Sequence, residues 1–135
     1  ERGKGAYLNN ETRLRVSARR NLDEAVLATG IPFLGHGQHA KFLKELHQIS
    51  QRVAGVRRFG AASLDLAYVA AGRFDGFWER DLKVWDIAAG LLLVTEAGGK
   101  ISEIDGADVM DTGNILATNP ELHGQVLARL QAASA

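Results

Sequence analysis

The sequence predicts a layered α/β sandwich, with a mostly parallel or mixed sheet, helices on its faces and a β-hairpin at the N-terminus. From residue 24 onward, short apolar runs typical of strands alternate with longer segments of helical periodicity. Residues 87–97 are apolar on nearly every side, as expected for a helix buried between layers. The 135 residues, of which 46% are hydrophobic, are enough for one sizeable core.

The first 20 residues are interpreted as a hairpin. Residues 4–9 and 12–17 read as two short strands, and Asn9-Asn10 between them is typical of a turn. Leu14 and Val16 alternate with arginines, so one face of the hairpin is polar. The edge of this hairpin should be exposed. Residues 21–135 are assigned to the α/β domain.

A buried strand is predicted over residues 24–29, because an apolar run there ends at Gly30 and Pro32. The loop Gly35-His36-Gly37 is only a weak signal for phosphate binding, since no helix-opening glycine motif follows. Residues 38–53 show the spacing of an amphipathic helix. His36, His39 and His47 are read as structural or exposed residues, because no third ligand has a spacing typical of zinc sites.

The next unit is a strand over residues 57–59, a helix over residues 61–71 and a strand over residues 73–79. The turn between the first two, from Gly60 to Ser63, consists of small residues. Small side chains at a helix start let a ligand approach the backbone N–H groups. Tight packing of the helix on the sheet explains them equally well.

The last unit begins with the apolar helix, for which Gly98-Gly99 supplies a C-terminal cap. Strands follow at residues 100–104 and 114–117, with a turn at Asp105-Gly106. Thr118-Asn119-Pro120 then predicts the start of a helix over residues 120–133.

Two carboxylates stand out around the apolar helix. Glu79 ends a strand, and Asp86 lies in the first turn of the helix, seven residues later. Ligands of α/β sheets bind at strand ends beside helix starts, which is where these residues are expected. The alternatives are ordinary ones: Asp86 could cap the helix, and Glu79 could be a solvated surface residue.

Composition narrows the function classes. The net charge is zero, which makes direct nucleic-acid binding unlikely, and the pairs Arg19-Arg20 and Arg57-Arg58 are typical of solvated faces. The chain has no cysteine, so disulfides, thiol catalysis and cysteine-based zinc sites are excluded. No apolar run reaches the roughly 18 residues that span a bilayer, and no signal peptide is visible, so a cytoplasmic location without a membrane partner is expected.

The stretch from Glu79 to Gly99, with Trp85-Asp86-Ile87-Ala88-Ala89-Gly90 and Thr95-Glu96-Ala97-Gly98-Gly99, closely resembles the C-terminal signature of the inositol monophosphatase family. The family consists of magnesium-dependent, lithium-sensitive phosphomonoesterases. The resemblance implies that Asp86 is a ligand of Mg²⁺ and that Glu79 binds the substrate's hydroxyls. It also implies that the turn at Gly60 lies beside the substrate, with Ala62 against the sugar ring, and that the protein forms a homodimer.

Family members are roughly twice as long, and their acidic Asp-Pro-x-Asp-Gly-Thr loop does not occur here. The chain therefore resembles the C-terminal half of such an enzyme, and we expect it to be inactive alone. Asp81 and Lys83 lie where the family varies, so the substrate stays open: inositol monophosphate, a sugar phosphate such as fructose-1,6-bisphosphate, histidinol phosphate or a nucleotide phosphate. The alternative is a protein-binding role in transcription and ribosomal RNA maturation, as in some bacterial relatives, with Arg57 and Arg58 facing an acidic partner.

Overall fold

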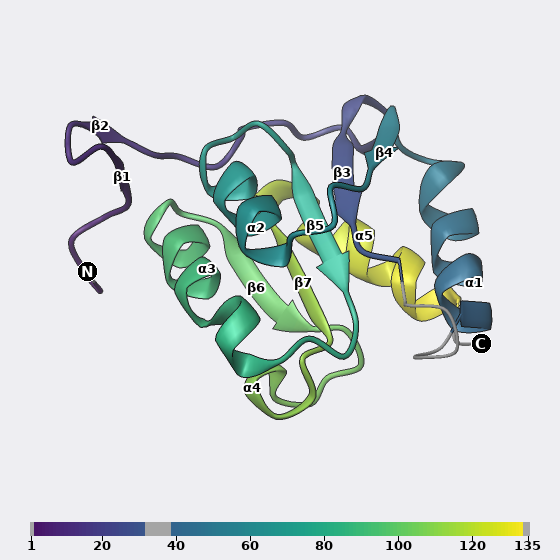
Figure 1. The fold of residues 1–135 in the computed structure, drawn as a ribbon. Coiled ribbons are helices and arrows are strands. Elements are labelled where there is room, and N and C mark those ends of the chain that lie inside the picture. The colour runs from purple at the N-terminus through teal and green to yellow at the C-terminus, as the bar shows by residue number, and fades with distance from the viewer. Residues whose placement is uncertain (1, 32–38, 134–135) are drawn as a thin grey trace.

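The computed structural model describes residues 2–31 and 39–133. A five-stranded mixed sheet in the order β4-β3-β5-β7-β6 carries helices on both faces, which confirms the predicted fold class (Figure 1). β3 pairs in parallel with β4 and β5, whereas β7 pairs antiparallel with β5 and β6. The elements are β1 Tyr7–Leu8, β2 Thr12–Arg13, a 3-10 turn at Leu22–Glu24, β3 Val26–Thr29, α1 His39–Ser50, β4 Gly55–Arg57, α2 Ala62–Ala70, β5 Gly76–Glu79, α3 Val84–Glu96, β6 Lys100–Glu103, α4 Val109–Thr112, β7 Ile115–Thr118 and α5 Pro120–Ala132.

The sheet separates two hydrophobic cores. Successive residues of β5 point to opposite faces, so Phe77 lies in the core under α2 and α3 and Trp78 in the core under α1 and α5. The same alternation splits Ala28 from Leu27 on β3 and Ala117 from Leu116 on β7. The position of a residue along a strand therefore decides which helical layer its side chain meets.

Several predicted boundaries were wrong by a few residues. The strand expected at residues 57–59 is β4 at Gly55–Arg57, where Val56 packs on the second core. Phe59 lies outside it, 55% exposed, and stacks on Phe74 with ring centroids 5.5 Å apart. β5 begins at Gly76 instead of Arg73, and α1 ends at Ser50, although Val53 still packs on the core. The loop Gly35-His36-Gly37 lies outside the described residues.

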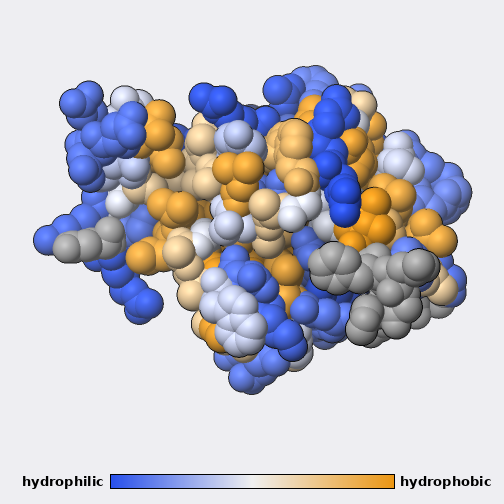
Figure 2. Space-filling model, in the orientation of Figure 1, coloured by the Kyte–Doolittle hydropathy of each residue, from blue (hydrophilic) through white to orange (hydrophobic). Residues whose placement is uncertain are grey.

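The apolar helix α3 is less buried than its sequence suggests. Its buried residues are Ile87, Gly90 and Val94, which face α2 and the sheet. Ala88 and Ala89 are exposed, and Trp85 is 77% exposed. The expectation of a helix covered on all sides was therefore wrong for this chain. Hydrophobic surface is visible over α2 and α3 in Figure 2. The predicted cap is confirmed, since Gly98 has a φ of 88° and donates to the carbonyl of Thr95.

The N-terminal hairpin pairs only with itself and stands apart from the five-stranded sheet among the described strands (Figure 1). Asn9 and Asn10 form its turn with φ values of 54° and 60°, a conformation that Asn tolerates well. The N–H groups of Gly3 and Gly5 donate to the Glu96 carboxylate at 2.8 and 2.7 Å. These contacts attach the segment before the hairpin to the end of α3. No described helix is both long and apolar enough to cross a membrane.

Candidate functional site

Glu79 is the last residue of β5, half-buried on the side of the sheet that carries α2 and α3. The pairing of Thr29 with Trp78 makes Gly30 its cross-strand neighbour. The Glu79 carboxylate lies over the Gly30 backbone, in space that a Cβ atom at position 30 would fill. The glycine therefore makes room for the carboxylate at the end of the strand.

Asp86 lies in the first turn of α3, as predicted. Its carboxylate accepts a hydrogen bond from the backbone N–H of Lys83 at 3.2 Å. The capping role considered from the sequence is thus present. A carboxylate in the first turn is also favoured by the helix dipole, and one carboxylate has lone pairs enough to cap the backbone and bind a further group.

The short segment that joins Glu79 to Asp86 is held by the β6–β7 connection. Asp81 adopts a left-handed conformation with a φ of 61°, and its N–H donates to Oδ1 of Asn114 at 2.9 Å. The N–H of Leu82 donates to the carbonyl of Gly113 at 3.1 Å. These bonds fix the path of the chain between the two carboxylates.

The pKa of Glu79 depends on Asp86 and on two further charged residues, Asp65 and Arg58, that the sequence analysis did not assign to the site. Burial raises the pKa of Glu79 to about 7, and the charges of Asp65 and Asp86 add to this effect, while Arg58 opposes it. Arg58 also lies next to Gly60. Glu79, Asp86, Asp65 and Arg58 therefore share one electrostatic environment at the ends of β5, α2 and α3.

Asp65 is the residue that sequence reasoning missed. It lies in the first half of α2, only 1% exposed, and neither carboxylate oxygen has a hydrogen-bond partner among the described residues. Burial raises its pKa to about 6. The sequence does contain a sign of this residue, because Asp65 is the one charged residue in the apolar run from Leu64 to Ala71. A carboxylate buried in such a run is costly unless it has a polar partner.

Gly60 and Ala62 lie where α2 begins. Gly60 is exposed with a φ of 80°, a conformation that favours glycine, and Ala62 is the half-buried first residue of the helix. Ala62 also packs against the core under α2 and α3, so the packing explanation of the small residues has support. Their contact with a substrate stays a prediction.

The described carboxylates fit a hard cation but do not form a complete site. Carboxylate oxygens are the ligands that hard divalent cations prefer, and Glu79 is repelled by the charges of Asp65 and Asp86, which a cation would offset. However, no group of three or more metal-binding side chains is close enough among residues 2–31 and 39–133. The assignment of Asp86 as one ligand of a metal ion stays a prediction. His39 and His47 lie on α1, and His36 lies outside the described residues, so the reading of these histidines as structural or exposed residues stays a prediction.

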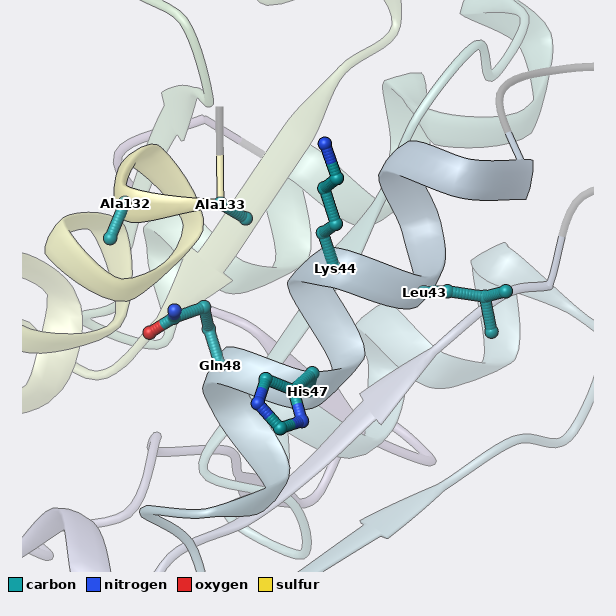
Figure 3. Close-up of a pocket in the computed structure, with 6 residues that line it drawn as sticks. All are labelled: Leu43, Lys44, His47, Gln48, Ala132 and Ala133. Carbon is teal, nitrogen blue, oxygen red and sulfur yellow. The ribbon is translucent and has the colours of Figure 1, made fainter. Parts of the chain in front are cut away.

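A pocket of about 350 Å³ lies on the opposite layer, between α1 and the end of α5 (Figure 3). Its lining contains Lys44 and His47 but no carboxylate. Gly60, Ala62, Glu79 and Asp86 are all outside it, so it is not the predicted site.

The model of the inositol monophosphatase family matches residues 1–135 of the chain. The chain belongs to the inositol monophosphatase family. The chain is 66% identical over 135 residues to an inositol-1-monophosphatase of Caulobacter vibrioides, an alignment that covers 98% of the chain and 53% of the relative. It is 47% identical over 133 residues to a Nus factor SuhB of Pseudomonas aeruginosa, covering 96% and 49%.

Among solved structures, this inositol monophosphatase family member superimposes on the extragenic suppressor protein SuhB of Bartonella henselae with a TM-score of 0.92. The two are 49% identical, and the match covers 97% of the chain and 51% of that structure. The chain thus spans about half the length of the relatives that it matches.

Proposed function

We propose that this chain is the substrate-recognising part of a magnesium-dependent phosphomonoesterase that hydrolyses inositol monophosphate or a related polyol or sugar phosphate. The observation that carries the proposal is the placement of Glu79 and Asp86 at a strand end and a helix start that share one electrostatic field. Family membership supports phosphatase chemistry, and the Caulobacter relative is named an inositol-1-monophosphatase.

Glu79 suits recognition of a polyol. Its carboxylate is held at the sheet end over Gly30, and two carboxylate oxygens can accept hydrogen bonds from two neighbouring hydroxyls. A half-buried acceptor gains more from such bonds than a solvated one. Gly60 and Ala62 lie near the start of α2, and we propose that their small size leaves space for a sugar ring.

Asp86 suits a shared magnesium site. Mg²⁺ is commonly bound by one or two carboxylates, with water and phosphate oxygens as its other ligands. When bound, the cation supplies positive charge to the phosphoryl group and activates water. The further protein ligands would come from outside this chain, which is why we expect the 135 residues alone to release negligible phosphate.

The test is Asp86→Asn in the full-length protein, measured as magnesium-dependent phosphate release. We expect activity to fall by about 100-fold or more, the scale typical of lost transition-state electrostatics. Asp111→Asn is a matched control, because Asp111 is an exposed carboxylate of α4. Near-normal activity of Asp86→Asn would contradict the metal-ligand assignment.

The exact ester is the finer part of the proposal. Lys83 is exposed just before α3 and could meet a second anionic group, as in a bisphosphate or a nucleotide. Measuring phosphate release by Lys83→Met and by the parent, with inositol monophosphate and with fructose-1,6-bisphosphate, distinguishes a monophosphate substrate from a bisphosphate. A selective loss on the bisphosphate would assign Lys83 to its second phosphate.

A second candidate is a protein-binding role in transcription. Relatives of this chain are named Nus factor SuhB. Arg57 ends the edge strand β4 and Arg58 follows it, and both are exposed. Because Arg58 also influences Glu79, Arg57→Glu is the cleaner charge reversal. Retention of RNA polymerase that survives Asp86→Asn but fails on Arg57→Glu would favour this role, and no retention at all would exclude it.

The remaining properties follow from the family resemblance. We propose a homodimeric, cytoplasmic enzyme that lithium inhibits, and a hairpin over residues 1–20 that joins the sheet of the other half of the protein. Tyr7 and Leu8 of the hairpin are 45% and 50% exposed, which leaves β1 available for such pairing. Sedimentation of the full-length protein and inhibition by lithium chloride test the first two properties.

A further inference from the structure

A buried ion network lies directly beside Glu79 in the sequence. Arg80 follows β5, and its side chain is only 8% exposed. Nε and one terminal nitrogen of its guanidinium each lie 2.9 Å from Oε2 of Glu45, and Nη1 donates to Asp105 at 2.7 Å. One guanidinium thus connects the end of β5 with α1 and with the turn after β6. We call these three residues the Arg80 clamp.

The clamp is more than a surface ion pair. Glu45 is 1% exposed and Asp105 has a side chain that is 41% exposed, so the Glu45 pair is largely shielded from water while the Asp105 pair borders solvent. Surface pairs contribute little, whereas removing one partner of a buried pair leaves an uncompensated charge. The planar guanidinium also fixes the direction of each bond, which lysine could not do.

At the end of β5, the clamp and the Glu79 carboxylate lie on opposite faces of the sheet. Residues 79 and 80 point to opposite sides of the sheet, so the clamp lies on the α1 side and the Glu79 carboxylate on the α2–α3 side. Glu79 occupies space that exists only because position 30 has no Cβ. A small shift or rotation of the backbone at residues 79–80 would move the carboxylate out of that space.

We propose that the Arg80 clamp is a positioning device for Glu79 and thereby sets selectivity for polyol phosphates without touching the substrate. This inference rests on the proposed recognition role of Glu79. It predicts that the clamp affects substrates through their hydroxyls alone. An aryl phosphate that lacks a polyol, such as p-nitrophenyl phosphate, should therefore be insensitive to it.

The experiment measures kcat and KM of the full-length protein with inositol monophosphate and with p-nitrophenyl phosphate. Arg80→Met should raise KM for inositol monophosphate about tenfold, because misplaced binding groups lose their substrate contacts. Values for p-nitrophenyl phosphate should stay within about twofold of the parent, since its binding uses no polyol contact. The double variant Arg80→Met/Glu79→Gln should be no worse than Glu79→Gln alone, because both changes act through one side chain.

Arg19→Met is the matched control. Arg19 also pairs with two carboxylates, Asp75 and Glu24, but its side chain is 44% exposed and lies away from β5's end in the fold. It should leave the ratio of the two substrates unchanged. If Arg80→Met fails to fold, Asp105→Asn takes its place, because it weakens the exposed side of the clamp and should shift the ratio in the same direction.

The outcomes separate the two proposals. If Glu79→Gln alters the substrate ratio and Arg80→Met or Asp105→Asn does not, the positioning role is wrong and the function stands. An equal loss on both substrates, or losses that add in the double variant, also contradicts positioning. If Glu79→Gln leaves the ratio unchanged, the recognition role of Glu79 is wrong and the positioning role falls with it.

Discussion

The carboxylate of Glu79 lies over the backbone of Gly30, its cross-strand neighbour, in space that any larger residue would claim. This relationship joins two strands at the sheet end where the candidate site is located. It can be tested at position 30 without altering Glu79 itself.

Gly30→Ala should displace Glu79 at little cost in stability. Gly30 does not have a positive φ, and the three atoms nearest to the new methyl group all belong to the Glu79 carboxylate, the end of a flexible side chain. We expect the free energy of unfolding to change by less than about 1 kcal/mol, the range of tolerated changes. In the full-length protein, KM for inositol monophosphate should rise while turnover of p-nitrophenyl phosphate is retained. A large loss of stability would show that the carboxylate cannot move.

Gly90→Ala should destabilise the fold by about 1–3 kcal/mol, the typical cost of overpacking. A Cβ at position 90 would lie 2.7 Å from the Cβ of Leu66, so α2 and α3 would have to separate. Urea unfolding measures the change. Gly124→Ala in α5 is the matched control: among the described residues, no atom outside its own helix backbone and chain neighbours lies within 4 Å of its new methyl group. It should stabilise the protein by about 0.5–1 kcal/mol through helix propensity.

Asp65→Asn should stabilise the protein at neutral pH. Burial raises the pKa of Asp65 from 3.8 to about 6, so the unfolded state ionises more readily than the folded state. The contribution of Asp65 to stability is therefore fully present below pH 3.8 and is lost as the pH rises through about 6. The loss is about 3 kcal/mol at most. Unfolding at several pH values should show a gain for Asp65→Asn at pH 7–8 and little difference near pH 4. A loss at pH 7–8 would mean that the carboxylate has a stabilising partner.

His123 should make the protein sensitive to acid. It is 2% exposed, and its ring nitrogens contact the hydroxyls of Ser102 and Thr118 at 2.7 and 2.9 Å. Burial, with a smaller effect of Lys100, lowers its pKa from 6.5 to about 4. The unfolded state thus binds the proton first, and stability falls by up to about 3 kcal/mol as the pH drops from 6.5 to 4.

His123→Gln is the test of that acid effect. We expect it to be less stable than the parent at pH 7.5, because it loses buried hydrogen bonds, with a difference that shrinks toward pH 4. A difference that stays constant across this range would exclude His123 as the acid-sensitive group.

Magnesium binding to the full-length protein should release a proton. Without a cation, Glu79 has a pKa raised to about 7 by burial and by Asp65 and Asp86. A cation at Asp86 favours the ionised form of Glu79, so apparent magnesium affinity should rise between pH 6 and 8. Calorimetry in two buffers of different ionisation enthalpy counts the protons. Glu79→Gln should abolish the release, and unchanged release would assign the proton to another group.

Local patterns in the sequence were sufficient for the fold class and for the two principal carboxylates. The alternation of strand and helix periods predicted the sheet with helices on both faces, and Asn9-Asn10 and Gly98 predicted a turn and a helix cap that the structure confirms. The spacing of Glu79 and Asp86 placed one at a strand end and the other at a helix start. These features depend on residues within a few positions of one another, which is why the sequence determined them.

Only the tertiary structure decided how those carboxylates are held. Gly30 meets Glu79 through the pairing register of β3 and β5, and Glu45 meets Arg80 across 35 positions of the chain. The burial of Asp65 depends on how α2 packs against α3, and the same packing leaves Ala88 and Ala89 exposed on a helix whose sequence predicts burial. Hydrophobic periodicity reports which face of an element is apolar, but strand register and helix packing decide which distant residues meet, and these contacts are set by the whole fold.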